Sequence, residues 1–99
     1  MRLTDFQIEE LVQRILNDTG LTREKLGAII DGMVSTYGIR EKYVRGEKEA
    51  DDYKYDMWDF YLSGSYEVLT HAGAHMQHLE ALVTELYWRK QEAKENAND

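Results

Sequence analysis

The sequence predicts an all-α protein, a small bundle of four helices with a long C-terminal helix through which it dimerises. Apolar residues recur at helical spacing along almost the whole chain, none of the 99 residues is proline, and clusters of glycine, serine and asparagine fall between the periodic runs. A chain of this length forms one domain with a modest core. We therefore expect a single α-helical domain over residues 1–92, followed by a polar, disordered tail over residues 93–99.

Threonine caps mark the starts of the first two helices. Thr4 is followed three residues later by Gln7, which is the spacing of a capping box, and an apolar stripe comes after it. The turn signals at residues 17–20 end this helix. Thr22 repeats the arrangement before a second apolar stripe, for which Gly38 is the predicted end.

A third helix is predicted after a loosely patterned basic stretch over residues 39–49. It begins at about Ala50, ends at Leu62 and is separated from the last helix by the breaker sequence Ser-Gly-Ser over residues 63–65. Four acids at spacings of three, four and three would then form one row on this helix, and we call this row the acidic ridge. Its residues are Glu49, Asp52, Asp56 and Asp59.

The last helix is expected to begin near Tyr66 and to run for about 28 residues, or about 42 Å at 1.5 Å per residue. A compact domain of this size has a radius of gyration of about 13 Å, so one chain cannot cover both ends of such a helix. We therefore expect a homodimer in which the last helices pair, with Trp88 beside Tyr87 as the interface anchor.

Three histidines, His71, His75 and His78, fall on one edge of the predicted last helix. Three interpretations stay open: interface histidines satisfied by nearby carboxylates, a dimer contact sensitive to pH near 6, and a metal site completed by ligands from another helix. Because Ala72 follows His71, the pattern is not the His-Glu-x-x-His motif. We predict neither a metal site nor a cofactor.

Composition excludes several classes of protein. The chain has no cysteine, which rules out disulfides and thiolate catalysis, and it contains no Gly-rich phosphate loop or nucleophile elbow, so we predict no enzyme. No stretch approaches the roughly 20 apolar residues needed to cross a bilayer, and the N-terminus lacks the apolar segment of a signal peptide. We expect a soluble cytoplasmic protein that does not bind membranes.

One segment carries a family resemblance. Residues 20–27, Gly-Leu-Thr-Arg-Glu-Lys-Leu-Gly, resemble the Leu-Thr-x-Glu-x-Leu-Ala opening of the helix-turn-helix in Cro-type repressors. The resemblance implies a DNA-binding motif over about a quarter of the chain, with Arg40, Lys42 and Arg45 in the recognition stretch after Ser35. DNA binding draws most of its affinity from phosphate neutralisation, for which a chain with net charge −7 is poorly equipped. A transcription regulator is therefore the alternative hypothesis.

The main hypothesis is a non-enzymatic interaction protein that binds a basic protein surface, such as a nucleic-acid-binding groove. The acid excess is concentrated in residues 46–60, which hold six acids and two bases. Aromatic residues anchor interfaces, and a negative ridge steers toward positively charged partners. In general type the chain looks like phage or prophage regulators and inhibitors, including anti-restriction and anti-CRISPR proteins. A purely structural homodimer is the third hypothesis. The predicted partner-binding residues are Glu49, Asp52, Asp56 and Asp59 for charge, and Tyr55 and Trp58 for apolar contact.

Overall fold

Four helices follow one another in the computed structural model. It describes residues 2–44, 46 and 52–97, and the side chains among them other than those of residues 43, 44, 52–56 and 97. The helices are α1 (Asp5–Thr19), α2 (Arg23–Val44), α3 (Asp52–His71) and α4 (Met76–Ala97). The described residues contain no strand. The all-α fold with four helices is therefore confirmed, whereas the predicted ends of the second and third helices and the predicted start of the last helix are wrong.

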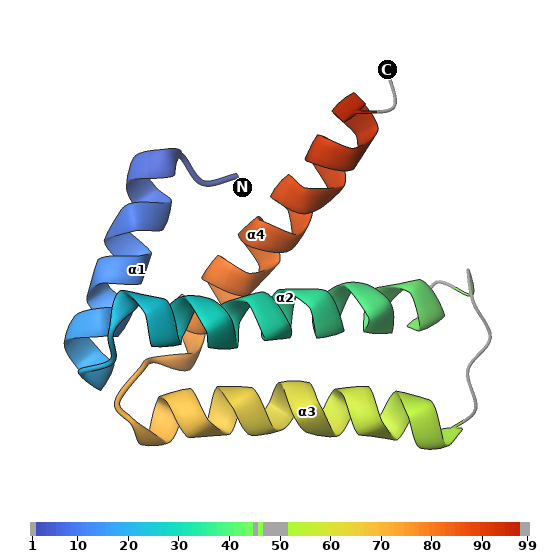
Figure 1. Ribbon diagram of the computed structural model, residues 1–99, viewed down its shortest axis with the longest axis horizontal. Helices are drawn as coiled ribbons and strands as arrows, with labels where there is room; N and C mark the ends of the chain where they lie inside the picture. Colours follow the sequence, from blue (N-terminus) through green and yellow to red (C-terminus); the bar gives the residue numbers. More distant parts are fainter. Residues whose placement is uncertain (1, 45, 47–51, 98–99) are drawn as a thin grey trace.

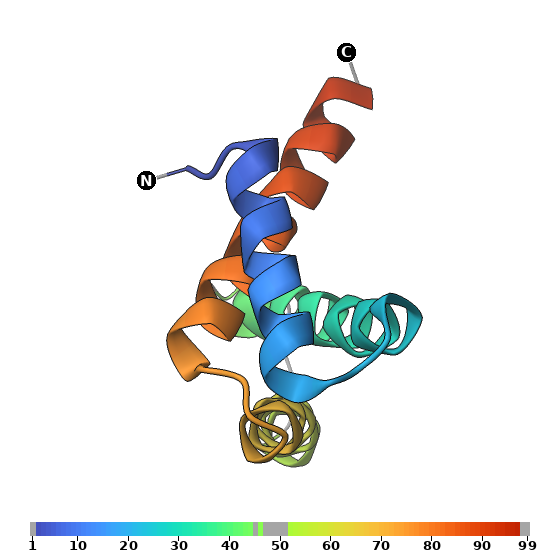
Figure 2. The same cartoon turned by 90° about the vertical axis from the view of Figure 1, so that its left-hand side faces the viewer.

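Helices α2 and α3 lie side by side and antiparallel, and α1 and α4 extend from the opposite side of α2 (Figure 1). The view along the α2–α3 pair shows α3 below α2, away from α1 (Figure 2). Helix α3 packs mainly on α2 and makes a smaller contact with α4. It is thus an outlying helix with one face on its neighbours and another that the described part of the chain does not cover.

The core lies where the inner faces of the four helices meet. Each helix contributes apolar side chains at helical spacing, because an α-helix returns to the same face every three or four residues. Helix α1 also packs on α4, and leucine and valine side chains of α4 fill the centre of the core. The largest fully buried side chains are Ile15, Leu26, Met33, Leu69, Leu79, Leu82 and Val83.

Both predicted threonine caps are confirmed. The Thr4 hydroxyl accepts a hydrogen bond from the Gln7 backbone N–H at 3.1 Å, and the Gln7 side-chain oxygen accepts one from the Thr4 N–H at 2.9 Å. The hydroxyl of Thr22 accepts from the Lys25 N–H at 3.2 Å. Gly20 ends α1 in the left-handed region, with φ of +71°.

The predicted end of the second helix at Gly38 is wrong, since α2 continues to Val44. A Cβ atom at Gly38 would lie 3.2 Å from the ring of Tyr87, and this ring packs edge-to-face on Tyr37 with centroids 4.9 Å apart. The glycine therefore makes room for a buried tyrosine of α4. Close packing, and not a helix end, explains its position.

The predicted break at residues 63–65 is also wrong. Leu62 and Leu69 are both buried, so one apolar face runs across Gly64 without a change of period. The Ser65 hydroxyl donates to the carbonyl oxygen of Tyr61 at 3.0 Å, which satisfies it inside the helix. The break comes instead at residues 72–75, where Gly73 has φ of +119° and touches the end of α1.

The expected long last helix from Tyr66 is consequently not formed. Residues 66–71 belong to α3, and α4 has 22 residues, the same number as α2. Helix α4 also includes residues 93–97, which were assigned to the polar tail. Tyr87 is only 3% exposed and Trp88 is 43% exposed. The argument from helix length for a dimer through the last helix therefore no longer holds.

Candidate functional site

Three acids of the predicted ridge, Asp52, Asp56 and Asp59, fall within α3. The helicity on which the ridge depends is thus confirmed from Asp52 onward, whereas Glu49 lies outside the described residues. The side chain of Asp59 is half exposed, and one carboxylate oxygen lies 3.9 Å from a guanidinium nitrogen of Arg40 on α2. This distance is near the limit of an ion pair, so Arg40 neutralises Asp59 only weakly.

The aromatic side chains of α3 differ in exposure. Trp58 is partly buried, and the side chain of Tyr55 lies outside the described set. Phe60 is 81% exposed, the largest value among the large apolar side chains that the structure describes, and Met57 and Tyr61 are each about half exposed. Among the described side chains of α3, the largest exposed apolar surface is therefore formed by Met57, Phe60 and Tyr61 and not by Trp58.

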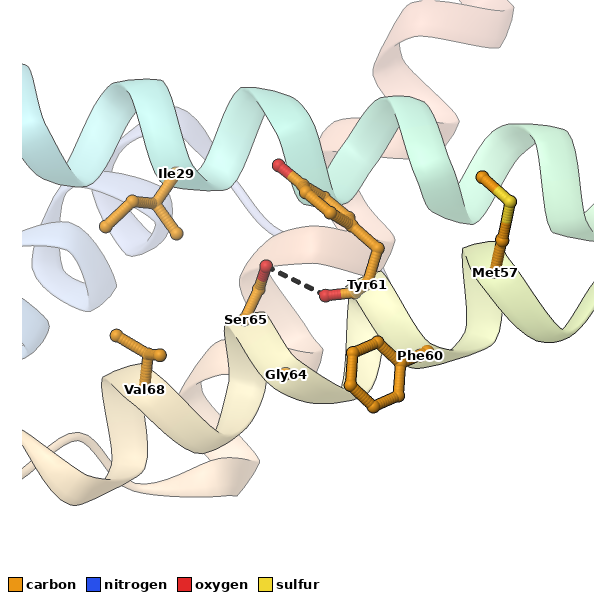
Figure 3. Close-up of a pocket in the computed structure, with 7 residues that line it drawn as sticks. All are labelled: Ile29, Met57, Phe60, Tyr61, Gly64, Ser65 and Val68. Atoms are coloured by element: carbon orange, nitrogen blue, oxygen red, sulfur yellow. Dashed lines mark hydrogen bonds between the residues drawn. The ribbon is translucent and has the colours of Figure 1, made fainter.

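An apolar groove of about 850 Å³ runs along α3 where it meets α2, and we call it the α3 groove (Figure 3). Its volume falls in the usual range for binding pockets, but it is open along one side. Of the described residues that line it, none carries a formal charge. The lining residues are Ile29, Met57, Phe60, Tyr61, Gly64, Ser65 and Val68.

The α3 groove exists because the two helices approach closely at one glycine. The Tyr61 ring reaches toward α2 (Figure 3), where its hydroxyl oxygen occupies the space that a Cβ atom at Gly32 would take. Ile29, one turn earlier on α2, and Val68 form the other end of the groove. A Cβ atom at Gly64 would meet nothing within 4 Å, so the centre of the groove is open.

Only part of the acidic ridge is turned away from the groove. Successive residues of an α-helix are rotated by about 100°, so Asp59 and Tyr61 point about 160° apart around the axis. Asp59 approaches Arg40, whereas Tyr61 covers Gly32, eight residues earlier on α2. Asp56 and Phe60 are one turn apart on the helix, so the acidic ridge borders the groove on the Phe60 side.

The sequence contained a signal for the groove that the predicted break at residues 63–65 concealed. Met57, Phe60, Tyr61, Gly64 and Val68 follow helical spacing and form one stripe, but only if the helix runs through Gly64. A helix that ends at Leu62 leaves Gly64 and Val68 outside it, so the stripe is cut to its first three residues.

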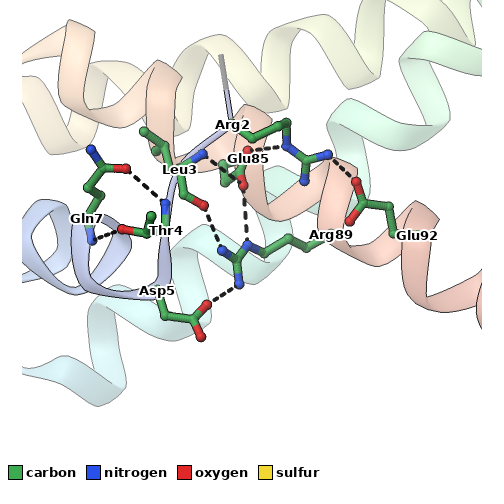
Figure 4. Close-up of polar contacts among 8 residues, drawn as sticks. All are labelled: Arg2, Leu3, Thr4, Asp5, Gln7, Glu85, Arg89 and Glu92. Carbon is green, nitrogen blue, oxygen red and sulfur yellow. Dashed lines mark hydrogen bonds and ion pairs between the residues drawn. The ribbon is translucent and has the colours of Figure 1, made fainter.

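A polar cluster joins the N-terminal segment and α1 to α4 (Figure 4). The Glu85 carboxylate is only 5% exposed and accepts hydrogen bonds from the Nε of Arg2 at 2.9 Å, the Nε of Arg89 at 3.3 Å and the N–H of Leu3 at 3.3 Å. Arg89 also donates to the Leu3 carbonyl oxygen at 2.8 Å and pairs with Asp5.

The hydrogen bond from Arg2 is the main reason that the pKa of Glu85 lies below its ordinary value, since burial alone would raise it. The hydrogen bond to Glu85, followed by the one to Glu92, raises the pKa of Arg2. Donors and acceptors thus satisfy one another within the chain. The cluster therefore acts as a structural clamp that holds the N-terminal segment on α4.

The three histidines do not share one helix, contrary to the prediction. His71 ends α3, His75 lies in the linker and His78 is in the first turn of α4. The rings of His75 and His78 meet edge-to-face with centroids 5.3 Å apart, and His75 Nε2 lies 4.0 Å from a carboxylate oxygen of Asp18. Within the described residues, no three histidine, aspartate or glutamate side chains are placed to hold a metal ion.

The helix-turn-helix expected after residue 35 is not formed. Residues 23–44 make one continuous helix, so Arg40 and Lys42 lie on the same helix as the segment that resembles the repressor motif. A helix-turn-helix needs a short turn and a second helix at a large angle. Arg45 lies outside the described residues. The resemblance is therefore limited to a well-capped helix start.

No helix in the part of the chain that the structure describes is long and apolar enough to cross a membrane. Comparisons with known protein families, with curated proteins and with solved structures give no match to this chain. The assignment of a function therefore depends on the chemistry of the two surfaces of α3.

Proposed function

We propose that this protein is a non-enzymatic interaction module that binds a basic protein surface through the acidic flank of α3. The observation that carries the proposal is the continuity of α3 from Asp52, which puts Asp52, Asp56 and Asp59 at spacings of four and three on one helix. Positions separated in this way share a helix face. Because the helix that carries these acids is already formed, binding does not have to order the backbone first.

The charge of the helix supports this proposal. Helix α3 contains four acids, the three named above and Glu67, against the single base Lys54, within a chain of net charge −7. Glu67 is 69% exposed on its side chain, and Asp59 retains half of its exposure beside Arg40. Exposed acids at this density steer basic partners into contact and contribute specificity more than raw affinity.

The experiment compares two triple variants of equal net charge. The first carries Asp52→Asn, Asp56→Asn and Asp59→Asn. The second is a matched control on the other helices, Glu10→Gln, Glu24→Gln and Glu95→Gln, which are all exposed. The probe is a designed helical peptide with a row of lysines, and its binding is measured by calorimetry at low and high salt.

The proposal expects the α3 variant to bind the lysine peptide about tenfold more weakly than the control at low salt, and to lose most of the salt dependence. Circular dichroism of both variants should match the wild-type spectrum, because each substitution exchanges a carboxylate for an amide of the same size on a helix. Equal losses in the two variants would show that total charge, and not the row on α3, governs binding.

A further inference from the structure

We infer that the α3 groove is the contact between two copies of this chain, packed antiparallel about a two-fold axis between residues 62 and 63. This inference does not rest on the proposed function, because it uses the uncharged residues of the groove and not the acids. The groove is an apolar surface that the ridge hypothesis does not use. Its shape, charge and exposure each bear on what covers it.

The first argument is self-complementarity. The first half of the stripe carries large residues, Met57, Phe60 and Tyr61, and the second half carries smaller ones, Gly64, Ser65 and Val68. An antiparallel copy with the axis between residues 62 and 63 places each large residue opposite a smaller one: Met57 faces Val68, Phe60 faces Ser65 and Tyr61 faces Gly64 of the second copy. A two-fold interface requires a surface that fits itself in this way.

The space needed for this arrangement is present. Phe60 projects from the helix with 81% of its surface exposed, and a Cβ atom at Gly64 would meet nothing within 4 Å. In this register the open position at Gly64 receives Tyr61 of the second copy, and Phe60 is a knob that projects over Ser65 beside it.

The second argument is charge. The chain carries net charge −7, so two copies repel each other over most of their surface. None of the described residues that line the groove carries a formal charge, and Asp59 approaches Arg40. Glu67, seven residues after Phe60 and 69% exposed on its side chain, is at the edge of this face. Self-association is therefore least opposed along the uncharged centre of the groove.

The third argument is area. Met57 and Tyr61 are each 51% exposed, Val68 is 62% exposed and Phe60 is 81% exposed. Side chains of these sizes expose on the order of 400 Å² of apolar surface per copy, which is within the range of functional patches on small proteins. A two-fold contact buries this surface on both copies. With the residues that surround it, the total buried area approaches about 1,200 Å², the low end for specific interfaces. We therefore expect a reversible dimer.

Sedimentation equilibrium tests the dimer with two substitutions and a matched control. Phe60→Ser removes the knob, and Phe6→Ser removes a phenylalanine of similar exposure, 72%, from α1. The wild type and Phe6→Ser should show the same monomer–dimer equilibrium, and Phe60→Ser should associate at least about tenfold more weakly. A wild-type chain that stays monomeric at its highest soluble concentration would overturn the inference and leave the groove to a different partner or an apolar ligand.

Gly64→Leu separates loss of association from loss of folding. The substitution replaces a glycine inside a helix and has open space around it, so it should make the monomer more resistant to denaturant. It also fills the position that receives Tyr61 of the second copy, so the dimer should dissociate. A variant that is both more stable and still dimeric would contradict the proposed packing.

Disulfide trapping tests the register, since the chain has no cysteine of its own. In the antiparallel packing, Met57 of one copy lies opposite Val68 of the other, whereas two Met57 residues are about 16 Å apart along the axis. A mixture of the Met57→Cys and Val68→Cys variants in a glutathione redox buffer should form the mixed disulfide dimer, and neither variant alone should do so. Crosslinking of either variant with itself would overturn the antiparallel register.

Discussion

The α1–α4 contact and the α2–α3 contact satisfy their surfaces in different ways. Where α1 and the N-terminal segment meet α4, the chain supplies both partners: the buried Glu85 carboxylate is held by Arg2, Arg89 and a backbone N–H. Where α2 meets α3, one face of α3 contributes to the core and the other leaves Phe60 and Val68 largely exposed. The first contact is complete within one chain, and the second is not.

This difference shows where function is to be sought. A polar cluster that satisfies its own donors and acceptors fixes the position of a helix but has little free capacity for a ligand. An exposed apolar face costs solvation free energy until something covers it, and large faces of this kind mark interaction sites. Substitutions in the first region should therefore change stability, and those in the second should change association.

The largest effect on stability is expected at Gly73. Its φ of +119° is rarely adopted by other residues, and a Cβ atom there would overlap the carbonyl oxygen of Asp18 at the end of α1. Gly73→Ala should lower the free energy of unfolding by about 3 kcal/mol in denaturant titrations. Gly27→Ala, in the second turn of α2 with open space around it, is the control and should raise it by up to about 1 kcal/mol.

A somewhat smaller loss is expected for Glu85→Gln. The carboxylate is 95% buried and holds two guanidinium groups, so an amide in its place leaves charge–charge contacts unmade and should cost about 2 kcal/mol of stability. The control is Glu92→Gln, whose side chain is 52% exposed beside Arg2 and whose thermal unfolding should match the wild type. Equal unfolding midpoints for the two variants would contradict the role of the buried clamp.

Acid should weaken the same contact. The pKa of Glu85 is lower in the folded chain than its ordinary value of 4.5, so its contribution is complete above about pH 4.5 and is lost as the pH falls through the lower folded value. Stability should fall with acid in that range. In the Glu85→Gln variant the fall should be shallower but not absent, because Arg23 also lowers the pKa of Glu9. An unchanged slope would show that Glu85 does not couple to folding.

The smallest effect is expected in the wall of the α3 groove. A Cβ atom at Gly32 would overlap the hydroxyl oxygen of Tyr61 but would lie 3.5 Å from the nearest ring carbon, an ordinary contact. Gly32→Ala should therefore change stability by less than about 1 kcal/mol, because the end of one side chain can move. In the Tyr61→Phe background, the same substitution should be stabilising. Alanine has a higher helix propensity than glycine, and no hydroxyl oxygen then overlaps the new methyl group. Denaturant titration of the four chains measures this coupling.

Local patterns predicted much of the fold. The capping box at Thr4, the cap at Thr22 and the apolar stripe of α2 depend on residues within four positions of one another, and the structure contains them all. The glycine positions could not be interpreted in the same way. Gly38 lies inside a helix against Tyr87, and Gly73 is at the true break against Asp18, so the contacts in these two cases come from residues far away in the sequence, whereas Gly64 lies inside a helix with open space around it.

The site was predicted in part for the same reason. The acids of α3 were identified from spacing alone, and the helix that aligns Asp52, Asp56 and Asp59 is present. The exposed face was not identified, since Met57, Phe60 and Tyr61 have the composition of a core. Only the position of α2 determines which side of α3 is covered.

The sequence by itself therefore determined that the chain is helical, where its first two helices start and which segment concentrates acids. These properties depend on the backbone and its near neighbours, whose interactions are fixed by spacing. The tertiary structure alone decided that α2 passes through Gly38, that Glu85 is buried between two arginines and that Tyr61 covers Gly32 in the wall of the groove. Each of these depends on the close approach of residues distant in sequence, for which local spacing carries no information.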